Sequence, residues 1–197
     1  MTRKYNMTRR AKRQEETRQR IVEATVELHQ SVGMARTTIS AIAEKAGVQR
    51  LTVYRHFPNE RALFYACSGH WSAANPPPDP ASWTQIADAE ERLKVALSEV
   101  YAYYGRTEPM LANAFRDAQV HPLTREIAEP FFELLERMRY VLATGWGMDD
   151  ERLGLLLAAL GHALDFQSWR SLVRQQGLSE EQAIELMIGM VRCLVHH

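Results

Sequence analysis

The sequence predicts an all-α protein with a smaller N-terminal and a larger C-terminal domain. Apolar residues recur at helical spacing through most of the chain, and no segment shows the alternation that is typical of a strand. The proline-rich segment SAANPPPDPAS (72–82) cannot form a helix, so we place the boundary there, between domains at 15–72 and 83–197. With 197 residues, of which 46% are hydrophobic, the chain is long enough to bury a real core.

Residues 1–14 hold six basic residues and no acid, and nothing in them can form a core. We therefore predict a flexible basic arm. It is expected either to lie along the phosphates or in the minor groove of a nucleic acid, or to act only as a solubilising tail. The first helix is expected from about Glu15 to Val32, and its buried stripe comprises Ile21, Ala24, Leu28 and Val32.

Residues 39–58 predict two short helices joined by a tight turn at Gly47, which is the arrangement of a helix-turn-helix. Thr38 can cap the first helix, because its hydroxyl can accept a bond from an unpaired N–H of the first turn. Gly47 follows the last apolar position, where a positive φ is usually needed to leave a helix. A further helix, capped by Asn59, is expected to pack under this unit. The inward positions of the two short helices are Ile39, Ile42, Ala43, Ala46, Val53 and Phe57.

The outward face of the second short helix carries hydrogen-bond donors and no acid. A solvated face would normally mix both charges, so this face suits a polyanion such as DNA. The alternative is an ordinary helical hairpin inside an all-α core. The outward residues are Gln49, Arg50, Thr52, Tyr54, Arg55 and His56.

The net charge of zero conceals an asymmetry along the chain. Residues 1–70 hold 13 Lys/Arg and 6 Asp/Glu, whereas residues 71–197 hold 11 and 18. A basic front and an acidic rear fit a protein that lays one end on phosphates. No apolar run approaches the ~20 residues that span a bilayer. Cys67 and Cys193 have no metal spacing, so two reduced thiols, a cytoplasmic location and no metal or cofactor are expected.

The segment from Thr17 to Trp71 resembles the DNA-binding domain of the TetR family of bacterial transcriptional repressors. The resemblance lies in TRQRIVEATVELHQSVG, the Thr37–Thr38 pair, IAEKAGV and LTVYRHFPNERALF. It implies a homodimer that binds a palindromic operator in double-stranded DNA and is released by a small-molecule effector. The remaining two thirds resemble the family only in size and helical character.

Two kinds of DNA contact are expected. Gln49, Arg50 and Thr52 are placed to touch base edges, and Arg50 can reach the O6/N7 edge of a guanine or else contact a phosphate only. The resemblance assigns phosphate contacts to Thr38, Tyr54 and His56. The chain departs from the family at Glu60, where many members have a lysine, so a contact there either passes to Arg61 or is lost.

The second domain is predicted to be helical throughout, with Pro130 expected to kink or break its helix. Its last two helices are apolar over more than one face, which favours a dimer contact over a purely internal core. The expected helices are 83–105, 108–119, 122–145, 149–175 and 179–195.

The resemblance also implies a small-molecule pocket in the second domain, and aromatic walls with a few polar groups suit such a site. Plain core is the competing interpretation for each residue. His162 and Asp165 are expected to share a helix face, where they could orient each other or a ligand, or form a structural or interface pair. The expected lining residues are Tyr101, Tyr104, Phe115, Met138, His162, Asp165 and Phe166.

The sequence shows no phosphate loop, nucleophile elbow or HExxH, so no enzyme is expected. A ligand-responsive repressor is the favoured hypothesis. The alternatives are a constitutive or architectural DNA-binding dimer without an effector, and a helical adaptor that binds protein and no DNA.

Overall fold

The chain is helical and contains no strand in the part that the structure describes, residues 2–196, with side chains at 9–149 and 152–195. This confirms the predicted all-α class. In this computed structural model the chain divides into two compact units. The first comprises the residues up to Pro76 together with Pro109–Ala128, and the second comprises Pro77–Glu108 and the residues from Glu129 onward. Residues 109–128 therefore belong with the N-terminal helices, although the sequence placed them in the second domain.

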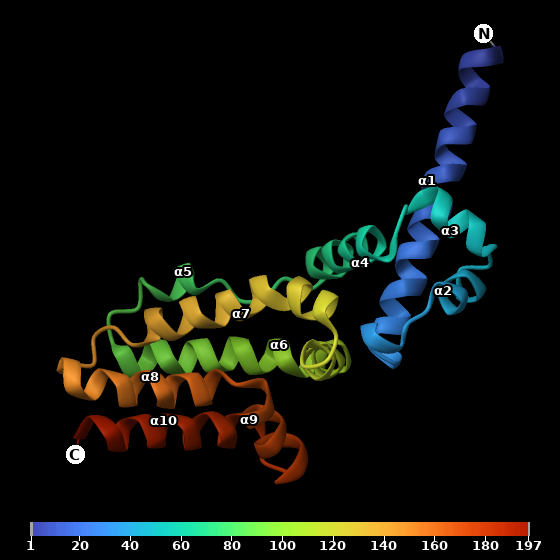
Figure 1. The fold of residues 1–197 in the computed structure, drawn as a ribbon. Coiled ribbons are helices and arrows are strands. Elements are labelled where there is room, and N and C mark those ends of the chain that lie inside the picture. The colour runs from blue at the N-terminus through green and yellow to red at the C-terminus, as the bar shows by residue number, and fades with distance from the viewer. Residues whose placement is uncertain (1, 197) are drawn as a thin grey trace. The chain divides into compact units, whose positions relative to one another are not determined.

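The first unit is built on α1 (Thr2–Ser31), against which α2, α3 and α4 pack (Figure 1). A short 3-10 turn, η1 (Met34–Arg36), leads into α2 (Ile39–Lys45), α3 (Arg50–His56) and α4 (Glu60–Ala74). These helices enclose one apolar cluster, which includes Ile21, Val22, Ala24, Ile42, Ala43, Val53, Phe57, Leu63 and Phe64.

The helix α1 begins at Thr2, so residues 2–14 are helical and do not form the flexible arm that the sequence predicted. Residues 2–20 contain no glycine or proline, and Arg, Lys, Gln, Glu, Met and Ala among them are good helix formers. The hydroxyl of Thr17 also donates to the carbonyl of Arg13 at 2.9 Å within the helix. The basic charge led us to predict an arm, but charge alone does not interrupt a helix.

The carbonyl groups at the end of α1 receive side chains from the end of α6 (Ala89–Ala118). Asn113 Nδ2 donates to the carbonyls of His29 at 3.0 Å and Gln30 at 2.8 Å, and Arg116 Nη2 donates to the carbonyl of Val32 at 3.0 Å. The last carbonyl groups of a helix have no hydrogen-bond donor inside it, so Asn113 and Arg116 supply donors to the carbonyls at the end of α1. They explain why residues 109–128 belong to the first unit.

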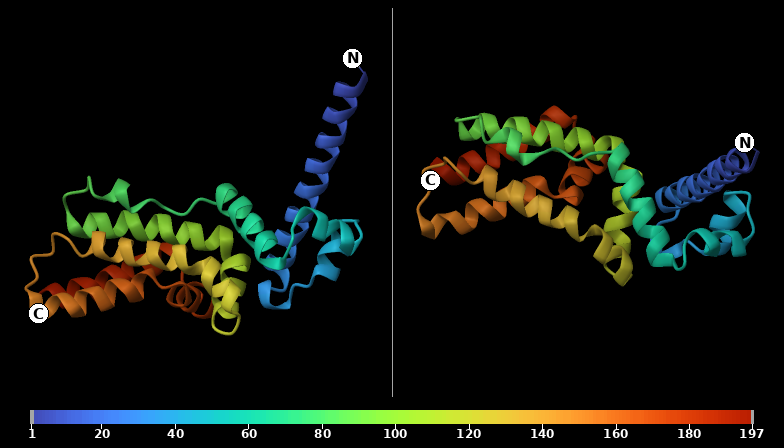
Figure 2. Two further views of the ribbon diagram at one scale, coloured as in Figure 1. Left: turned by 45° about the horizontal axis from the view of Figure 1, so that its top comes forward. Right: turned by 90° about the horizontal axis from the view of Figure 1, so that it is seen from above.

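In the second unit, the parts of α6 and α7 (Pro122–Leu142) that it contains run side by side (Figures 1 and 2), and α8 packs on α10. The remaining elements are α5 (Pro80–Trp83), α8 (Asp150–Leu164), α9 (Phe166–Arg170), the π-helical turn η2 (Ser171–Gln175) and α10 (Glu180–His196). Its core includes Trp83, Leu93, Leu97, Tyr101, Tyr104, Leu160, Phe166 and Trp169.

Three helix boundaries in this part of the chain differ from the prediction. The expected helices 83–105 and 108–119 are one helix, α6, with Pro109 inside it. Pro130 lies within a continuous α7, so the alternative of a broken helix is wrong. The expected helix 149–175 is interrupted at Asp165, whose backbone is extended (φ −71, ψ 130) and whose carboxylate caps α9. No helix of the described residues is both long and apolar enough to cross a membrane.

Candidate nucleic-acid interface

Local capping and burial hold α2 and α3 in a fixed arrangement. Thr38 Oγ1 accepts from the N–H of Ala41 at 3.2 Å and caps α2, as the sequence predicted. Gly47 has φ +65, and the N–H of the next residue, Val48, donates to the carbonyl of Ala43 at 2.9 Å. Val53 is fully buried and anchors α3 to the core. The opposite face of α3 is therefore held outward.

The outward face of α3 is exposed and contains no acid among its described residues. Gln49, Arg50 and Arg55 are exposed, and Tyr54 is 43% exposed. Leu51 is 69% exposed on this face and was not among the residues predicted from the sequence. Its spacing from Tyr54, three positions later, would have shown that the two share a face. An exposed leucine here can contact a thymine methyl group, which polar side chains read poorly.

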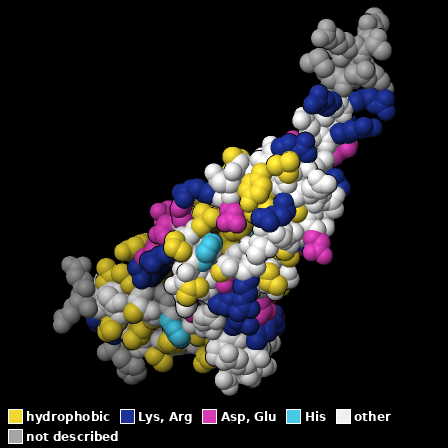
Figure 3. Space-filling model, turned by 45° about the vertical axis from the view of Figure 1, so that its right-hand side comes forward, with side chains coloured by type: hydrophobic (Ala, Val, Ile, Leu, Met, Phe, Trp, Pro, Cys, Tyr) yellow, Lys and Arg dark blue, Asp and Glu magenta, His cyan; other side chains and the backbone are white. Residues whose placement is uncertain are grey.

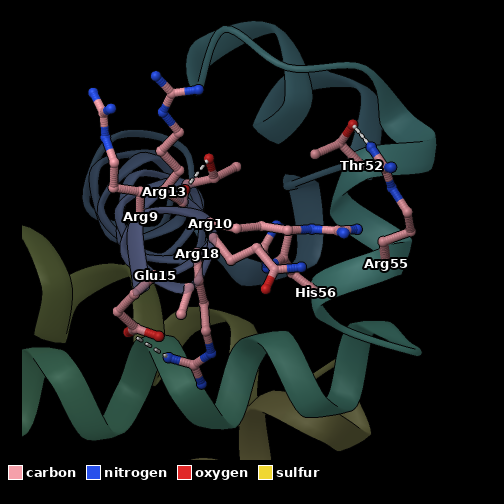
Figure 4. A pocket seen from close by; sticks show the side chains of 11 residues that line it. Arg9, Arg10, Arg13, Glu15, Arg18, Thr52, Arg55 and His56 are labelled. Carbon is pink, nitrogen blue, oxygen red and sulfur yellow. Dashed lines mark hydrogen bonds and ion pairs between the residues drawn. The ribbon is translucent and has the colours of Figure 1, made fainter. Parts of the chain in front are cut away.

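Two of the predicted DNA-binding residues, Thr52 and His56, are half-buried. Arg55 Nη2 donates to Thr52 Oγ1 at 2.8 Å, so this hydroxyl already has a partner within the helix. His56 is half-buried in the same region. Thr52, Arg55 and His56 line a cleft of about 750 Å³ between α3 and the N-terminal part of α1 (Figure 4).

The cleft is strongly basic. Arg10 extends from α1 toward Arg55 and His56 (Figure 4). Figure 3 shows lysine and arginine side chains, in dark blue, gathered along the exposed part of α1. The one acid of the lining, Glu15, lies 4.0 Å from Arg18. The lining comprises Arg9, Arg10, Ala11, Arg13, Gln14, Glu15, Thr17, Arg18, Thr52, Arg55 and His56.

Arg61, the predicted replacement for a lysine contact, is engaged within the first unit. Its guanidinium forms an ion pair with Glu126 of α7, and the hydroxyl of Tyr65 donates to the same carboxylate. The bond from Tyr65 lowers the pKa of Glu126, so the carboxylate stays charged beside Arg61. Glu60 stands in the first turn of α4, and Asn59 caps that helix by accepting from the N–H of Ala62 at 2.8 Å. A phosphate contact by Arg61 would have to compete with Glu126.

Part of this domain matches a family of known proteins. Residues 21–67 match the sequence profile of the bacterial regulatory proteins of the tetR family. This segment of the chain therefore matches the TetR family. The profile contains α2, α3 and the segments of α1 and α4 that enclose the apolar cluster.

Individual regulators also match part of this chain. The HTH-type transcriptional regulator TtgR of Pseudomonas putida is 46% identical over 61 residues, which cover 30% of this chain and 29% of TtgR. The nucleoid occlusion factor SlmA of Marinobacter nauticus is 45% identical over 49 residues, 25% of each chain. The chain therefore matches less than a third of the length of these relatives.

Solved structures extend the likeness to the fold of most of the chain. A TetR-like transcriptional regulator from Rhodococcus sp. RHA1 has a TM-score of 0.63 and 19% identity, and the match covers 92% of this chain and 97% of that one. A protein of Saccharomonospora viridis solved in complex with choline has a TM-score of 0.62 and 17% identity, covering 90% and 96%. At these identities the likeness shows the fold alone.

The TetR-family domain also contains a buried polar pair, in which one residue belongs to α1 and the other to α4. Cys67 Sγ lies 3.4 Å from His29 Nδ1, and the His29 ring meets the ring of Phe64 edge-on at 4.6 Å. Burial lowers the pKa of His29 to about 4 and raises the pKa of the Cys67 thiol to about 12. Both groups are thus neutral near pH 7, which suits core packing. Among the described residues, no group of three or more metal-ligating side chains is close enough to hold a metal ion.

The residues predicted to line an effector pocket are divided in the structure. Tyr101, Tyr104, Met138 and Phe166 are buried in the second unit. The hydroxyl of Tyr101 donates to the carbonyl of Ala163 at 3.0 Å, and that of Tyr104 donates to the carbonyl of Leu164 at 2.5 Å. Phe115 belongs to the first unit and is half-buried there. The cavities of about 750, 580 and 240 Å³ that the structure describes are lined by other residues.

The expected pair of His162 and Asp165 is joined through a third residue. Both side chains are exposed, and Ser168 lies between them. The hydroxyl of Ser168 is 3.0 Å from His162 Nδ1 and donates to Asp165 Oδ1 at 3.2 Å, and the same carboxylate caps α9. This arrangement fits a structural or interface role better than a pocket lining.

Proposed function

We propose that the protein is a transcriptional regulator that binds a palindromic DNA operator as a homodimer. The observation that supports this most strongly is the outward, acid-free face of α3, anchored by the buried Val53 inside a TetR-family domain. A face with this chemistry on a rigid helix suits the major groove of DNA. Repression of the regulated gene, with release of the operator by a small molecule, is the regulatory mode that we infer.

Within this proposal, the exposed residues of α3 divide the work of recognition. Gln49 and Arg50 contact base edges, Leu51 contacts a thymine methyl group, and Tyr54 holds a phosphate. Thr52 accepts a bond from the Arg55 guanidinium and keeps its hydroxyl proton for a base edge. Thr38 keeps its hydroxyl proton for a phosphate, since capping uses only the oxygen as an acceptor.

The second unit supports the homodimer through an apolar surface on α8 and α10. Leu155 is 58% and Leu186 52% exposed, and these two helices pack against each other. Ala158 is exposed and follows Leu155 at helical spacing, and the exposed Cys193 follows Leu186 by seven positions, so each helix continues this face. Apolar surface of this kind commonly marks a protein interface.

The dimer is tested by replacing Leu155 and Leu186 with glutamate in one double variant. We expect sedimentation equilibrium to show a dimer for the parent and a monomer for the variant, with operator binding lost in the variant. Val120, which is 78% exposed in the first unit, supplies the control as Val120→Glu. An unchanged dimer in the Leu155/Leu186 variant would contradict this interface.

One observation favours a second candidate function, a constitutive DNA-binding dimer. Tyr101 and Tyr104 are buried, and backbone carbonyls satisfy both hydroxyls, so a ligand could reach these residues only after they move. The choline-bound neighbour supports the ligand-responsive alternative, because it has the same fold. A compound that raises the melting temperature and weakens operator binding would select the ligand-responsive regulator. The Tyr104→Phe variant of the protein would then test whether Tyr104 takes part in binding that compound.

The DNA-binding function itself is tested with a duplex selected from random sequences by the purified protein. We expect fluorescence anisotropy to show tight binding to the selected duplex and weaker, strongly salt-dependent binding to an unrelated duplex. A protein that binds no duplex at low salt would exclude the proposal and favour a protein-binding adaptor.

A further inference from the structure

The N-terminal turns of α1 form one wall of a cleft whose other wall is α3. Residues 9–18 supply Arg9, Arg10, Arg13 and Arg18, and α3 supplies Thr52, Arg55 and His56. The TetR-family match begins only at residue 21, so this wall precedes the matched region. The cleft brings five arginines into a volume of about 750 Å³, with Glu15 as the one acid.

The charges along this wall favour an anion between them. Arg10 and Arg13 are three positions apart on α1, and like charges at this spacing destabilise a helix. Arg55 and His56 face them across the cleft. The one acid of the lining, Glu15, is paired with Arg18. A bound polyanion would therefore relieve the repulsion between Arg10 and Arg13.

We propose that this cleft binds phosphates of the DNA backbone beside the segment that α3 reads. This inference rests on the proposed function and extends its binding site to the N-terminal turns of α1. Arg10 and Arg13 approach the strand from α1, while Arg55 and His56 approach it from α3. Because Thr52 and Arg55 belong to the same helix as Arg50 and Tyr54, a duplex seated on α3 brings its flanking strand to the mouth of the cleft.

The proposal has two consequences that a simple recognition helix lacks. The operator should extend beyond the base pairs read by α3, because flanking phosphates contribute to affinity without contributing sequence information. Each arginine that contacts a phosphate should also steepen the dependence of log K on log salt concentration by about 0.9.

The test compares two variants of the same helix. Arg10→Ala/Arg13→Ala removes two cations from the cleft. Lys12→Ala removes a cation that is exposed on α1 but does not line the cleft. Alanine preserves the helix, since it has the highest helix propensity. Circular dichroism and thermal melting of each variant confirm that the fold is unchanged.

Each protein is titrated at several salt concentrations with the selected operator, once with native flanks and once trimmed to the two half-sites. We expect the double variant to bind the flanked operator about tenfold or more weakly, with a shallower salt slope. The Lys12→Ala variant should have the affinity and the salt slope of the parent. Trimming the flanks should weaken operator binding by the parent and by Lys12→Ala. It should change operator binding by the double variant little.

Three outcomes would overturn the inference. The double variant could bind the flanked operator as tightly as the parent does. Lys12→Ala could lose as much affinity as the double variant, or trimming the flanks could weaken binding by all three proteins equally. Calorimetry with inorganic phosphate adds another arm: a loss of phosphate binding in the double variant, with DNA binding unchanged, would make the cleft a small-anion site instead. In each case tight binding by the parent leaves the proposed function intact, whereas a parent that binds no duplex removes the function itself.

Discussion

Asp117 of α6 accepts a hydrogen bond at 3.0 Å from the backbone N–H of Ala35, which precedes it by 82 positions in the chain. The Asp117 side chain is buried, and Arg116 Nε donates to its other oxygen at 2.8 Å. The same guanidinium donates to the carbonyl of Val32. Together with Asn113, these bonds attach the end of α6 to the turn that joins α1 to α2. The helix-turn-helix is therefore supported by a segment from the middle of the sequence.

Replacing Asp117 by alanine should destabilise the first unit. The change removes a charge-assisted bond to Ala35 and leaves Arg116 without its carboxylate, which should cost about 1–3 kcal/mol of unfolding free energy. Urea denaturation measures the loss. Glu133→Ala, an exposed acid on α7, serves as the control and should be near neutral. Equal effects of the two changes would show that Asp117 contributes nothing through these bonds.

Gly33→Ala should destabilise the same turn for two separate reasons. Gly33 has φ +91 and ψ 164, a region that is essentially restricted to glycine and costs a side chain on the order of 1–3 kcal/mol. A Cβ atom there would also overlap the side chains of Asp117 and Arg116. Gly147→Ala provides a comparison at positive φ without a clash, because Gly147 has φ +66 and open space where the Cβ would stand. We expect Gly33→Ala to lower the midpoint of urea unfolding clearly more than Gly147→Ala. Equal shifts would contradict the steric part of the argument.

Acidification should destabilise the protein through His29. Burial lowers the pKa of His29 from 6.5 to about 4, so the unfolded chain binds this proton at a higher pH than the folded chain does. The stability that the neutral ring provides is fully present above pH 6.5 and is lost as the pH falls toward 4, by about 3 kcal/mol in total. Urea unfolding from pH 7 to pH 4.5 measures the slope.

His29→Gln provides the comparison for this pH dependence. Glutamine does not titrate, so we expect the variant to lose less stability than the parent over the same pH range, even where its stability at pH 7 is lower. The carboxylates titrate alike in both proteins and drop out of the difference. Parallel curves for the two proteins would show that His29 is not the group responsible.

The sequence predicted the helix-turn-helix well because its signals are local. Thr38, Gly47 and Val53 act within a few residues of their positions, and apolar spacing is enough to place them. The position of residues 109–128 depends on Asn113 and Asp117 meeting groups more than 80 positions away, and no local pattern carries that information.

Two features of the candidate interface could not be predicted from local sequence patterns. Pairing of Arg61 with Glu126 joins residues 65 positions apart, so from the sequence Arg61 looked available for phosphate. The basic cleft depends on α1 continuing through residues 2–14, and a run of positive charge was interpreted as an arm. The positive charge of this segment did not indicate its conformation.

Arg50 and Tyr54 provide the test that separates base recognition from backbone contact. Both are exposed on α3, one helical turn apart. Arg50→Ala should weaken binding to the selected operator by ~1–3 kcal/mol and relax the base preference at one position in each half-site. Tyr54→Ala should weaken binding to the selected and unrelated duplexes by similar factors, because a phosphate contact does not depend on sequence. Anisotropy titrations of both variants against all four bases at each position measure the two effects. If Arg50→Ala weakens binding to every duplex equally, Arg50 contacts a phosphate, and reading of the operator must be assigned to Gln49, Leu51 and Thr52.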